Sequence, residues 1–247
     1  MQLIVSRKLD GVSGVTFGFS TRTGGMSPEP WGMNLSYRVG DDPANVAMNR
    51  GKFFGSLGIR EEQLAIPGQC HSSNVAVVRA AGAIPETDAL VTTVSGICLV
   101  VSVADCVPVF LADRNGTAVA AVHAGWRGSA EQIVSHTLRT LAERCHVDPT
   151  NVVAFLGPGA GPCCYEIGSE VAERFPGDVL RRVNGSLHLD MKTENIRQLV
   201  EGGVSPDSIE DSQQCTICNA GVFHSYRRDG KRSGRMMGVI GLKMKAE

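Results

Sequence analysis

The sequence predicts one domain that mixes strands and helices. Its 247 residues suit one large domain or two small ones, and the even spread of apolar residues, without a Pro/Ser-rich linker, favours a single domain over residues 1–247. A strong hairpin signal near the middle of the chain predicts antiparallel strands. Amphipathic segments with capping residues, on both sides of that hairpin, predict helices. The chain is long enough for these elements to share a substantial core.

The predicted hairpin is the stretch around which the other elements are arranged. Two apolar segments, residues 108–112 and 117–122, flank Asn115-Gly116. Asn-Gly is the strongest short signal for a two-residue turn between antiparallel strands. If the residues on either side of this dipeptide face each other, the register of the whole ribbon is fixed. The register then decides to which face each side chain points.

This register brings a thiol and an imidazole together. It places Pro108 opposite His123 and makes Cys106 the diagonal neighbour of His123 on one face, with Cβ atoms roughly 7 Å apart or a little less. One ion could bridge the pair, or the imidazole could act as a base toward the thiol. The alternative is a buried cysteine beside a hydrogen-bonded core histidine. The polar neighbours Asp105 and Arg127, in an otherwise apolar hairpin, favour chemistry.

Capping residues and apolar stripes predict four helices. A capping side chain followed by proline, or by glutamine three residues later, marks a helix start, and glycine or Asp-Pro marks an end. The predicted helices run from Asp42-Pro43 to Gly58, from the capping box Ser129–Gln132 to Asp148-Pro149, around residues 170–174, and over residues 193–201 before Gly202-Gly203. Their inward-facing residues are Val46, Phe53, Phe54 and Leu57 in the first, Val134, Leu138, Leu141 and Cys145 in the second, and Ile196, Leu199 and Val200 in the last.

Short apolar or alternating runs predict strands elsewhere in the chain. The run over residues 97–103 is continuously apolar, as expected of a strand that is buried on both faces, and it leads directly to Asp105-Cys106. The other predicted strands are residues 15–20, 64–66, 75–78, 89–92 and 152–156.

Charge and composition indicate small-molecule partners. The formal net charge is -1 and no run of five like charges occurs, so neither a nucleic-acid groove nor a polybasic membrane patch is indicated. The amino terminus lacks a long apolar core behind a basic start, and no segment approaches the roughly eighteen apolar residues of a membrane span. We therefore expect a cytoplasmic protein. In that compartment the eight cysteines are expected as thiols, metal ligands or a nucleophile.

Three residues are candidate ligands of one metal ion. They are His71, Cys106 and His123, and His71 lies in the turn-rich segment that begins at Pro67. Two imidazoles and one thiolate leave the fourth tetrahedral position open, which is typical of a catalytic zinc. Water bound at that position would become a nucleophile near neutral pH.

The remaining cysteines do not match a zinc motif. Cys215 and Cys218 form a C-x-x-C pair, but a structural site needs a second pair, and the other close cysteines, Cys163 and Cys164, are adjacent in sequence. We therefore expect no four-cysteine site. The zinc deaminase signature is also absent, because no H-x-E occurs and no proline precedes the C-x-x-C pair.

Several residues are candidates for binding a substrate anion or moving a proton. The predicted helix start after Gly128 opens beside the hairpin, and free backbone N–H groups at a helix start bind anions. Arg22 lies in a Gly-rich turn, Arg127 beside the helix start, and Arg228 in an arginine pair before a turn. Glu166 follows a rigid Gly/Pro loop and could act as a general acid or base. An ordinary exposed side chain is the alternative for each.

Five motifs follow one another along the chain. They are GDDP at the first predicted helix, ADCVPV and AVHAGWRG in the hairpin, GPGAGPCCYEIG in the loop that contains Glu166, and SYRRDG near the end. Together they resemble the YfiH or laccase-domain family, also labelled the multicopper polyphenol oxidase domain, and the similarity extends from Phe17 to Gly238. The resemblance implies a single-domain α+β fold of four layers, an α/β/β/α sandwich with helices outside two mixed sheets.

The resemblance also implies a metal and an activity. The histidine of Q-x-H, the cysteine of ADC and the histidine of HAGW bind zinc in that family, and these are His71, Cys106 and His123 here. The implied reactions are phosphorolysis of adenosine, inosine, guanosine and methylthioadenosine, with deamination of adenosine. A purine nucleoside and phosphate are then the partners, with no nucleic acid or membrane, and the chain is expected as a monomer or weak homodimer. Copper is the less favoured alternative to Zn2+, because the family's older label is a copper laccase.

The chemistry of the candidate residues favours some of these activities over others. Phosphorolysis needs an anion pocket beside a purine cavity, for which Arg22, Arg127 and Arg228 are candidates, with Asn34 for a substrate hydroxyl or base edge. Deamination needs an activated water, which an open zinc position supplies. A multicopper oxidase needs many histidines, and the chain has six.

Two further functions remain as alternatives. Some bacterial members of the family are called peptidoglycan editing factors, and a zinc-free hydrolase with a Cys106 nucleophile and a His123 base would suit that role. A non-enzymatic nucleotide-binding module is the other. The chain also departs from the family pattern where Cys70 and Ser72 flank His71, at His224, where phenylalanine is common, and at Phe17, often a histidine. These departures weaken any transfer of substrate preference.

Overall fold

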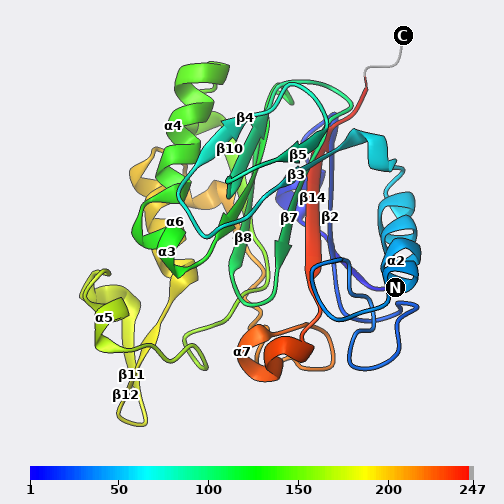
Figure 1. Ribbon diagram of the computed structural model, residues 1–247. Helices are drawn as coiled ribbons and strands as arrows, with labels where there is room; N and C mark the ends of the chain where they lie inside the picture. Colours follow the sequence, from blue (N-terminus) through cyan, green and yellow to red (C-terminus); the bar gives the residue numbers. More distant parts are fainter. Residues whose placement is uncertain (245–247) are drawn as a thin grey trace.

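Two six-stranded β-sheets pack face to face between two layers of helices (Figure 1). The computed structural model describes residues 1–244, so the last three residues of the predicted domain lie outside the described part. Helix α2 covers the outer face of one sheet, and α4 and α6 cover the outer face of the other. The predicted four-layer α/β/β/α arrangement is confirmed.

The first sheet is mixed. Strand β14 lies at its centre and is antiparallel to both of its neighbours, β2 and β7, whereas β3 is parallel to β7 and to β5. In spatial order the strands are β1 (Leu3–Ile4), β2 (Val15–Ser20), β14 (Met236–Leu242), β7 (Cys98–Val103), β3 (Leu64–Pro67) and β5 (Gly82–Ile84).

The second sheet contains the predicted hairpin. Strands β8 and β9 pair with Pro108 opposite His123, so the register derived from the Asn-Gly turn is confirmed. In spatial order the strands are β13 (Ile209–Asp211), β10 (Val152–Leu156), β8 (Val107–Asp113), β9 (Val119–Ala124), β6 (Ala89–Thr92) and β4 (Val75–Val77). A separate hairpin joins β11 (Leu180–Val183) to β12 (Ser186–Leu189).

The helices differ widely in length. The three long ones are α2 (Pro43–Ser56), α4 (Ile133–Cys145) and α6 (Met191–Glu201). The short ones are α1 (Arg7–Asp10), α3 (Trp126–Ala130), α5 (Ser169–Ala172) and α7 (Tyr226–Asp229), with 3-10 turns at Glu61–Gln63, Pro149–Asn151, Gly177–Val179, Pro206–Ser208 and Gly230–Arg232. Within residues 1–244, no helix has the length and apolar character needed to cross a membrane.

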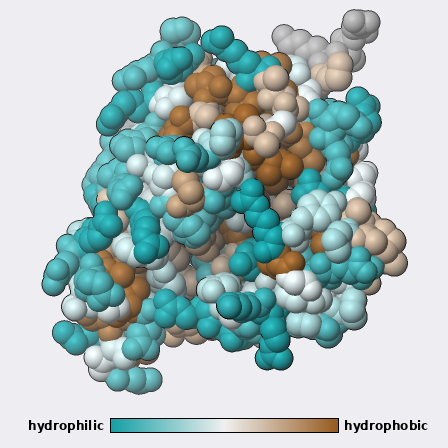
Figure 2. All heavy atoms as spheres, in the orientation of Figure 1, coloured by the Kyte–Doolittle hydropathy of each residue, from teal (hydrophilic) through white to brown (hydrophobic). Residues whose placement is uncertain are grey.

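Aromatic side chains fill the space between the sheets. Phe17 on β2 meets Phe110 on β8 and Phe155 on β10 edge to face, with ring centroids 4.9 and 5.2 Å apart. Phe110 points toward the first sheet, while its neighbours Val109 and Leu111 point toward the helices. Strand β8 is covered on both faces, and its sequence is apolar up to Asp113 at its end. Figure 2 shows a mainly hydrophilic surface on this side, with hydrophobic residues gathered over the edge strands β4 and β5.

The first predicted helix is confirmed, and the predicted start of the second is wrong. Asp42 caps α2, its side chain accepting a hydrogen bond from the backbone N–H of Ala44 at 2.8 Å. Ser129, in contrast, is buried inside α3 and contacts Asn195 of α6. Gln132 adopts a left-handed conformation with φ 61°, and α4 begins only after it. The Ser129 hydroxyl therefore bonds to Asn195 on α6 and does not cap α4 as the capping box predicts.

The inward face of α6 is mostly polar. Leu199 is buried as predicted, but Val200 is 41% exposed and was wrongly expected to face inward. Asn195 and Gln198 are fully buried instead and bond to the start of the α3–α4 segment. The apolar stripe alone therefore does not predict how this helix packs, because Asn195 bonds to the Ser129 hydroxyl and Gln198 to backbone groups of the α3–α4 segment.

Candidate active site

Three elements bring His71, Cys106 and His123 together. His71 lies in the loop between β3 and β4, Cys106 directly precedes β8, and His123 lies near the end of β9. One donor atom from each of the three lies within 4.8 Å of the other two, and Nε2 of His71 is 3.9 Å from Sγ of Cys106. The two imidazole rings meet edge to face with centroids 4.9 Å apart. The prediction that Cys106 and His123 share a face of the hairpin is confirmed.

Hydrogen bonds from Gln69 hold the loop that carries His71 against the first sheet. The side-chain amide of Gln69 exchanges two hydrogen bonds of 2.8 Å with the backbone of Ser102, which fixes the loop to β7. His71 has φ 62°, so the turn-rich segment turns sharply at this residue. Cys70 is outside the ligand group, because its Sγ lies 3.4 Å from a carboxylate oxygen of Asp88.

Asp88 organises the site, and the sequence reasoning missed it. Its buried carboxylate accepts hydrogen bonds from the backbone N–H groups of residues 70–72 at 3.2, 3.1 and 2.8 Å. It also accepts a 2.7 Å hydrogen bond from Nδ1 of His123, which leaves Nε2 of that ring free for a ligand. Burial alone would raise the pKa of Asp88, but the hydrogen bonds from His123 and Ser72 hold it well below its usual range.

Cys106 and His123 stabilise each other's charged forms. Burial opposes ionisation of both groups, but the attraction between thiolate and imidazolium outweighs it. The pKa of the Cys106 thiol falls to about 6, and the pKa of His123 rises to about 9, with the Asp88 carboxylate adding to the second shift. The thiolate is the form that binds metals and attacks electrophiles.

Gly125 makes room for the ligands. A Cβ atom at this position would lie 3.0 Å from Sγ of Cys106 and 3.1 Å from Cδ2 of His71. Both distances are shorter than about nine in ten real Cβ contacts, so a larger residue would push these two ligands by a few tenths of an ångström. Space, and not backbone conformation, therefore favours glycine here.

The donor set fits a single catalytic metal ion. Two imidazole nitrogens and one thiolate sulfur are suitable zinc ligands, and three protein ligands leave one position for substrate. The same donors also occur in copper sites. The remaining histidines do not form a second cluster within residues 1–244: His136 and His146 belong to α4 and its end, His188 bonds to the carbonyl of Pro162, and His224 is buried alone. A multicopper centre therefore lacks ligands in this part of the chain.

The three ligands open into a pocket of about 810 Å³. Aromatic rings and guanidinium groups both line its walls, and four of the arginines stack on rings at 4.3 to 5.4 Å from the ring centroid. The flat rings suit a heterocyclic base, and the guanidinium groups suit an anion. These wall residues are Tyr37, Arg38, Arg50, Trp126, Arg127, Tyr165, Tyr226, Arg227 and Arg235.

Asp105 ties the pocket loops to the metal-ligating hairpin. It precedes Cys106, is buried, and has φ 96°. Its carboxylate accepts hydrogen bonds from Oγ1 of Thr216 at 2.6 Å and from the backbone N–H of Arg227 at 2.7 Å. Its carbonyl accepts a third, at 2.7 Å, from the backbone N–H of Ala160. One strained residue therefore sets the position of three separate segments beside Cys106.

Of the five predicted substrate-binding residues, the structure brings only Arg127 to the pocket wall. Arg22 pairs with Glu29 at 2.6 Å, and Asn34 is fully buried and donates to Asp41 at 2.9 Å. Arg228 pairs with Asp229 at 2.7 Å and donates to three backbone carbonyls, while Glu166 is exposed beside the β11–β12 hairpin.

The residue that replaces Arg228 in the pocket is its neighbour Arg227. Ser225 caps α7 by accepting a hydrogen bond from the backbone N–H of Arg228, so the two arginines point in different directions. The expected anion site at a helix start after Gly128 is also wrong, because the backbone N–H of Ser129 donates to the carbonyl of Gly125 inside α3. The arginines of the pocket wall are the cationic groups that remain for an anion.

The profile of a family described as multi-copper polyphenol oxidoreductase laccase matches residues 16–243. The chain belongs to this laccase family. A relative from Corynebacterium glutamicum, named a purine nucleoside phosphorylase, is 38% identical over 237 residues, which cover 92% of this chain and 94% of the relative. The adenosine deaminase RL5 of an unknown prokaryotic organism is 36% identical over 224 residues, covering 83% of this chain and 84% of the relative.

Solved structures of the laccase family share the fold. The crystal structure of YfiH from Bacillus licheniformis is similar to this chain with a TM-score of 0.88 at 32% identity, covering 93% of each chain. The resemblance to the YfiH family that the motifs indicated is thereby confirmed.

Proposed function

We propose that this member of the laccase family is a zinc-dependent purine nucleoside phosphorylase that accepts adenosine, inosine, guanosine and methylthioadenosine and also deaminates adenosine. The proposal rests on one observation: the three candidate metal ligands lie in the wall of a pocket of about 810 Å³ that aromatic rings and arginines also line. The relatives support it, because one is named a purine nucleoside phosphorylase and another an adenosine deaminase.

Each wall of the pocket has a part in this proposal. The rings of Trp126 and Tyr226 offer apolar surfaces for the purine and exclude water from it. The guanidinium groups of Arg127 and Arg227 bind phosphate, and each is kept in place by a ring, 4.3 Å away for Trp126 and 5.0 Å for Tyr165. These two guanidinium groups would neutralise the charge of a phosphate bound beside the nucleoside.

The protein fixes the orientation of the metal ligands, and metal binding would displace the Nε2 proton of the His123 imidazolium. Zinc bound by His71, Cys106 and His123 supplies Lewis-acid chemistry and an open coordination position. Asp88 keeps the proton of His123 on Nδ1 and thereby presents Nε2. Copper is the alternative ion for the same donors.

A product analysis tests the proposal. The purified protein is incubated with adenosine, with and without phosphate. Adenine and ribose 1-phosphate that form only with phosphate support phosphorolysis, inosine supports deamination, and the absence of all three contradicts the proposal. Metal analysis of the same sample distinguishes zinc from copper.

Matched variants test the role of the metal. His71→Ala and Cys106→Ala should lose the metal of the His71, Cys106 and His123 site together with turnover, whereas Cys145→Ala, on α4, should keep both. Phosphorolysis that persists in a variant without metal at this site would refute the role given to zinc.

One observation favours a second candidate. Cys106, His123 and Asp88 are arranged as a nucleophile, a base and an orienting carboxylate, which is the pattern of a cysteine hydrolase acting on acyl or amide bonds such as those of cell-wall precursors. In that case His71→Ala should retain hydrolysis of an amide substrate, and alkylation of Cys106 should abolish it. Loss of all activity in His71→Ala favours the metal centre.

A further inference from the structure

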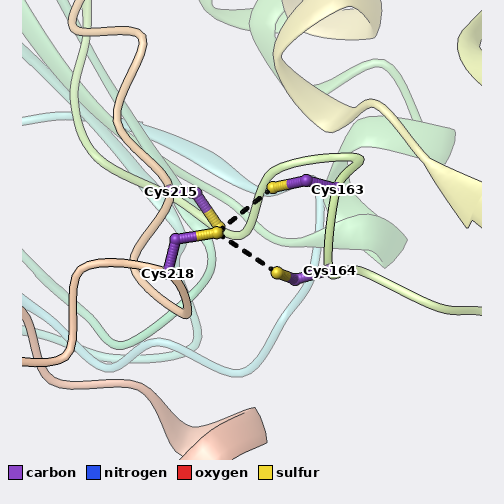
Figure 3. A group of neighbouring side chains, drawn as sticks. All are labelled: Cys163, Cys164, Cys215 and Cys218. Carbon is purple, nitrogen blue, oxygen red and sulfur yellow. Dashed lines mark hydrogen bonds between the residues drawn. The ribbon is translucent and has the colours of Figure 1, made fainter.

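Four cysteines meet at a second place in the molecule, outside the pocket. The sequence predicts no four-cysteine site, because Cys163 and Cys164 are adjacent, and the structure overturns that expectation. The sulfurs of Cys163, Cys164, Cys215 and Cys218 all lie within 4.8 Å of one another, and Figure 3 shows them converging from two loops. Sγ of Cys218 lies 3.5 Å from that of Cys163 and 3.3 Å from that of Cys164.

Local turns explain why adjacent cysteines can point to the same centre. The backbone N–H groups of Cys164 and Tyr165 both bond to the carbonyl of Gly161, at 3.0 and 2.9 Å, so the segment is a tight helical turn. In such a turn, successive side chains are rotated by about 100° and do not point to opposite sides as in a strand. The C-x-x-C pair forms a similar turn, closed by a 3.2 Å bond from the N–H of Asn219 to the carbonyl of Cys215.

The two turns are held together by the sheet below them. Strands β10 and β13 are parallel neighbours, so their carboxyl ends meet at one edge of the sheet. The pairing continues past the strands as a parallel bridge between Gly159 and Cys215. The backbone N–H of Gly161 donates to Sγ of Cys215 at 3.3 Å, and a Cβ at Gly161 would lie 3.2 Å from Cβ of Cys215. The backbone therefore both makes room for the sulfurs and donates to one of them.

The spacing of the sulfurs fits one ion. Two sulfurs bound to the same zinc at roughly 2.3 Å each cannot be more than about 4.6 Å apart, and a tetrahedral arrangement separates them by about 3.8 Å. The observed separations of 3.3 and 3.5 Å lie within this maximum and within about 0.5 Å of the tetrahedral value. They exceed the S–S bond of about 2.05 Å, and all four residues are free cysteines.

We propose that Cys163, Cys164, Cys215 and Cys218 bind a structural zinc ion that is separate from the catalytic metal. Four thiolates close the coordination shell, which is the pattern of a structural and not a catalytic site. The ion ties the loop after β10 to the loop before α7. These loops supply Tyr165, next to Cys164, and Thr216, whose hydroxyl bonds to Asp105 beside the active site. The second zinc thereby fixes one wall of the pocket.

Metal stoichiometry of matched variants tests the second site. The full-length protein is purified from zinc-containing medium, desalted, and analysed for metal per chain. The expected values are two zinc ions for the wild type and for the control Cys145→Ser, and one for Cys218→Ser and for His71→Ala. Unchanged zinc in Cys218→Ser, or a single zinc in the wild type that is lost with His71→Ala, would overturn the proposal.

A spectroscopic test does not depend on the folding of Cys218→Ser. The His71→Ala variant, in which the cluster is intact, is loaded with Co2+. Strong thiolate-to-cobalt charge transfer together with tetrahedral d–d bands is the expected result. A spectrum without these bands, a disulfide among the four cysteines of fresh protein, or bound iron in place of zinc would contradict it. A wild type with two zinc ions but no phosphorolysis would leave this inference intact and contradict only the proposed function.

Discussion

A single carboxylate connects the two histidines of the active site. Asp88 receives the backbone N–H of His71 and the ring N–H of His123, so it sets the position of one ligand and the tautomer of the other. Groups that bond to metal ligands in this way usually change metal affinity without touching the ion. Asp88 is therefore a positioning residue for both sides of the metal.

We expect Asp88→Asn to weaken zinc binding by about 10- to 100-fold, because the amide cannot accept all the hydrogen bonds that the carboxylate accepts. Competition with a chelator of known affinity measures the change. Asp113→Asn is the matched control, since Asp113 is also buried but bonds to Thr117 at the hairpin turn. An equal loss of affinity in both variants would mean that the effect is one of general stability.

Gly125→Ala should damage the same centre by crowding. The new methyl group would press on Cys106 and His71, and misplacing a reacting group by about 1 Å can lower turnover roughly 100-fold. Turnover and zinc content are measured together with the thermal midpoint. In the control Gly51→Ala, a Cβ on α2 meets nothing within 4 Å. Normal zinc content and activity in Gly125→Ala would show that the site relaxes around the methyl group.

The sequence predicts where a side chain points when a turn nearby in the chain fixes its direction. The turn at Asn115-Gly116 fixes which face carries Cys106 and His123, and this could be worked out from the sequence. The contact of His71 with Asp88 spans two loops and has no local signal, except that an acidic residue directly precedes a buried strand. For the adjacent arginines at the end of the chain, only the cap made by Ser225 decides that Arg227 faces the pocket.

At the scale of elements, α6 completes the start of α4. Gln198 accepts a hydrogen bond from the backbone N–H of Val134 at 3.2 Å and donates to the carbonyl of Ser129 at 2.8 Å. The first N–H groups of any helix lack partners within the helix. The buried amide of Gln198 therefore takes over the capping that the sequence had assigned to Ser129.

Gln198→Leu should destabilise the fold by about 2 kcal/mol, because it leaves the buried backbone N–H of Val134 without its partner and removes one of the two hydrogen bonds to the carbonyl of Ser129. Urea unfolding at constant m-value measures the difference. Val200→Ala, on the exposed face of α6, is the control and should change stability by less than about 0.5 kcal/mol. A larger effect for Val200→Ala than for Gln198→Leu would contradict this description of the helix interface.

Element boundaries were predictable where caps act locally, as Asp42 does for α2. They were not predictable around Ser129, because Asn195, far along the chain, competes for its hydroxyl. The cysteine cluster shows the same limit: spacing in sequence separates Cys163 from Cys218, and only the parallel pairing of β10 with β13 brings their loops together.

At the scale of the whole molecule, the packed layers of residues 1–244 leave one buried histidine ring without a hydrogen-bond partner. His224 is fully buried, and neither ring nitrogen has a hydrogen-bond partner among residues 1–244. Burial, and next the positive charge of Arg22, lowers the pKa of His224 to about 3. The folded protein therefore keeps this ring neutral at pH values where the unfolded chain would protonate it.

The sign of the resulting pH dependence follows. Between about pH 6.5 and pH 3 the unfolded state binds more protons at this position, so stability falls as the pH falls. Lowering the pH from 7 to 4.5 should cost about 3 kcal/mol through His224. His224→Phe should lose much less stability over this range, as measured by urea unfolding at several pH values. His136→Gln, on α4, is the control, and identical pH profiles for His224→Phe and the wild type would refute the prediction.

The central place of β14 in the first sheet has a consequence for synthesis. This strand is translated after all the others, yet it is inserted between β2 and β7. Until it leaves the ribosome, the facing edges of those two strands carry unpaired backbone groups, which are templates for association with other chains. The first sheet must therefore stay open, and accessible to chaperones, until residues 236–242 have emerged.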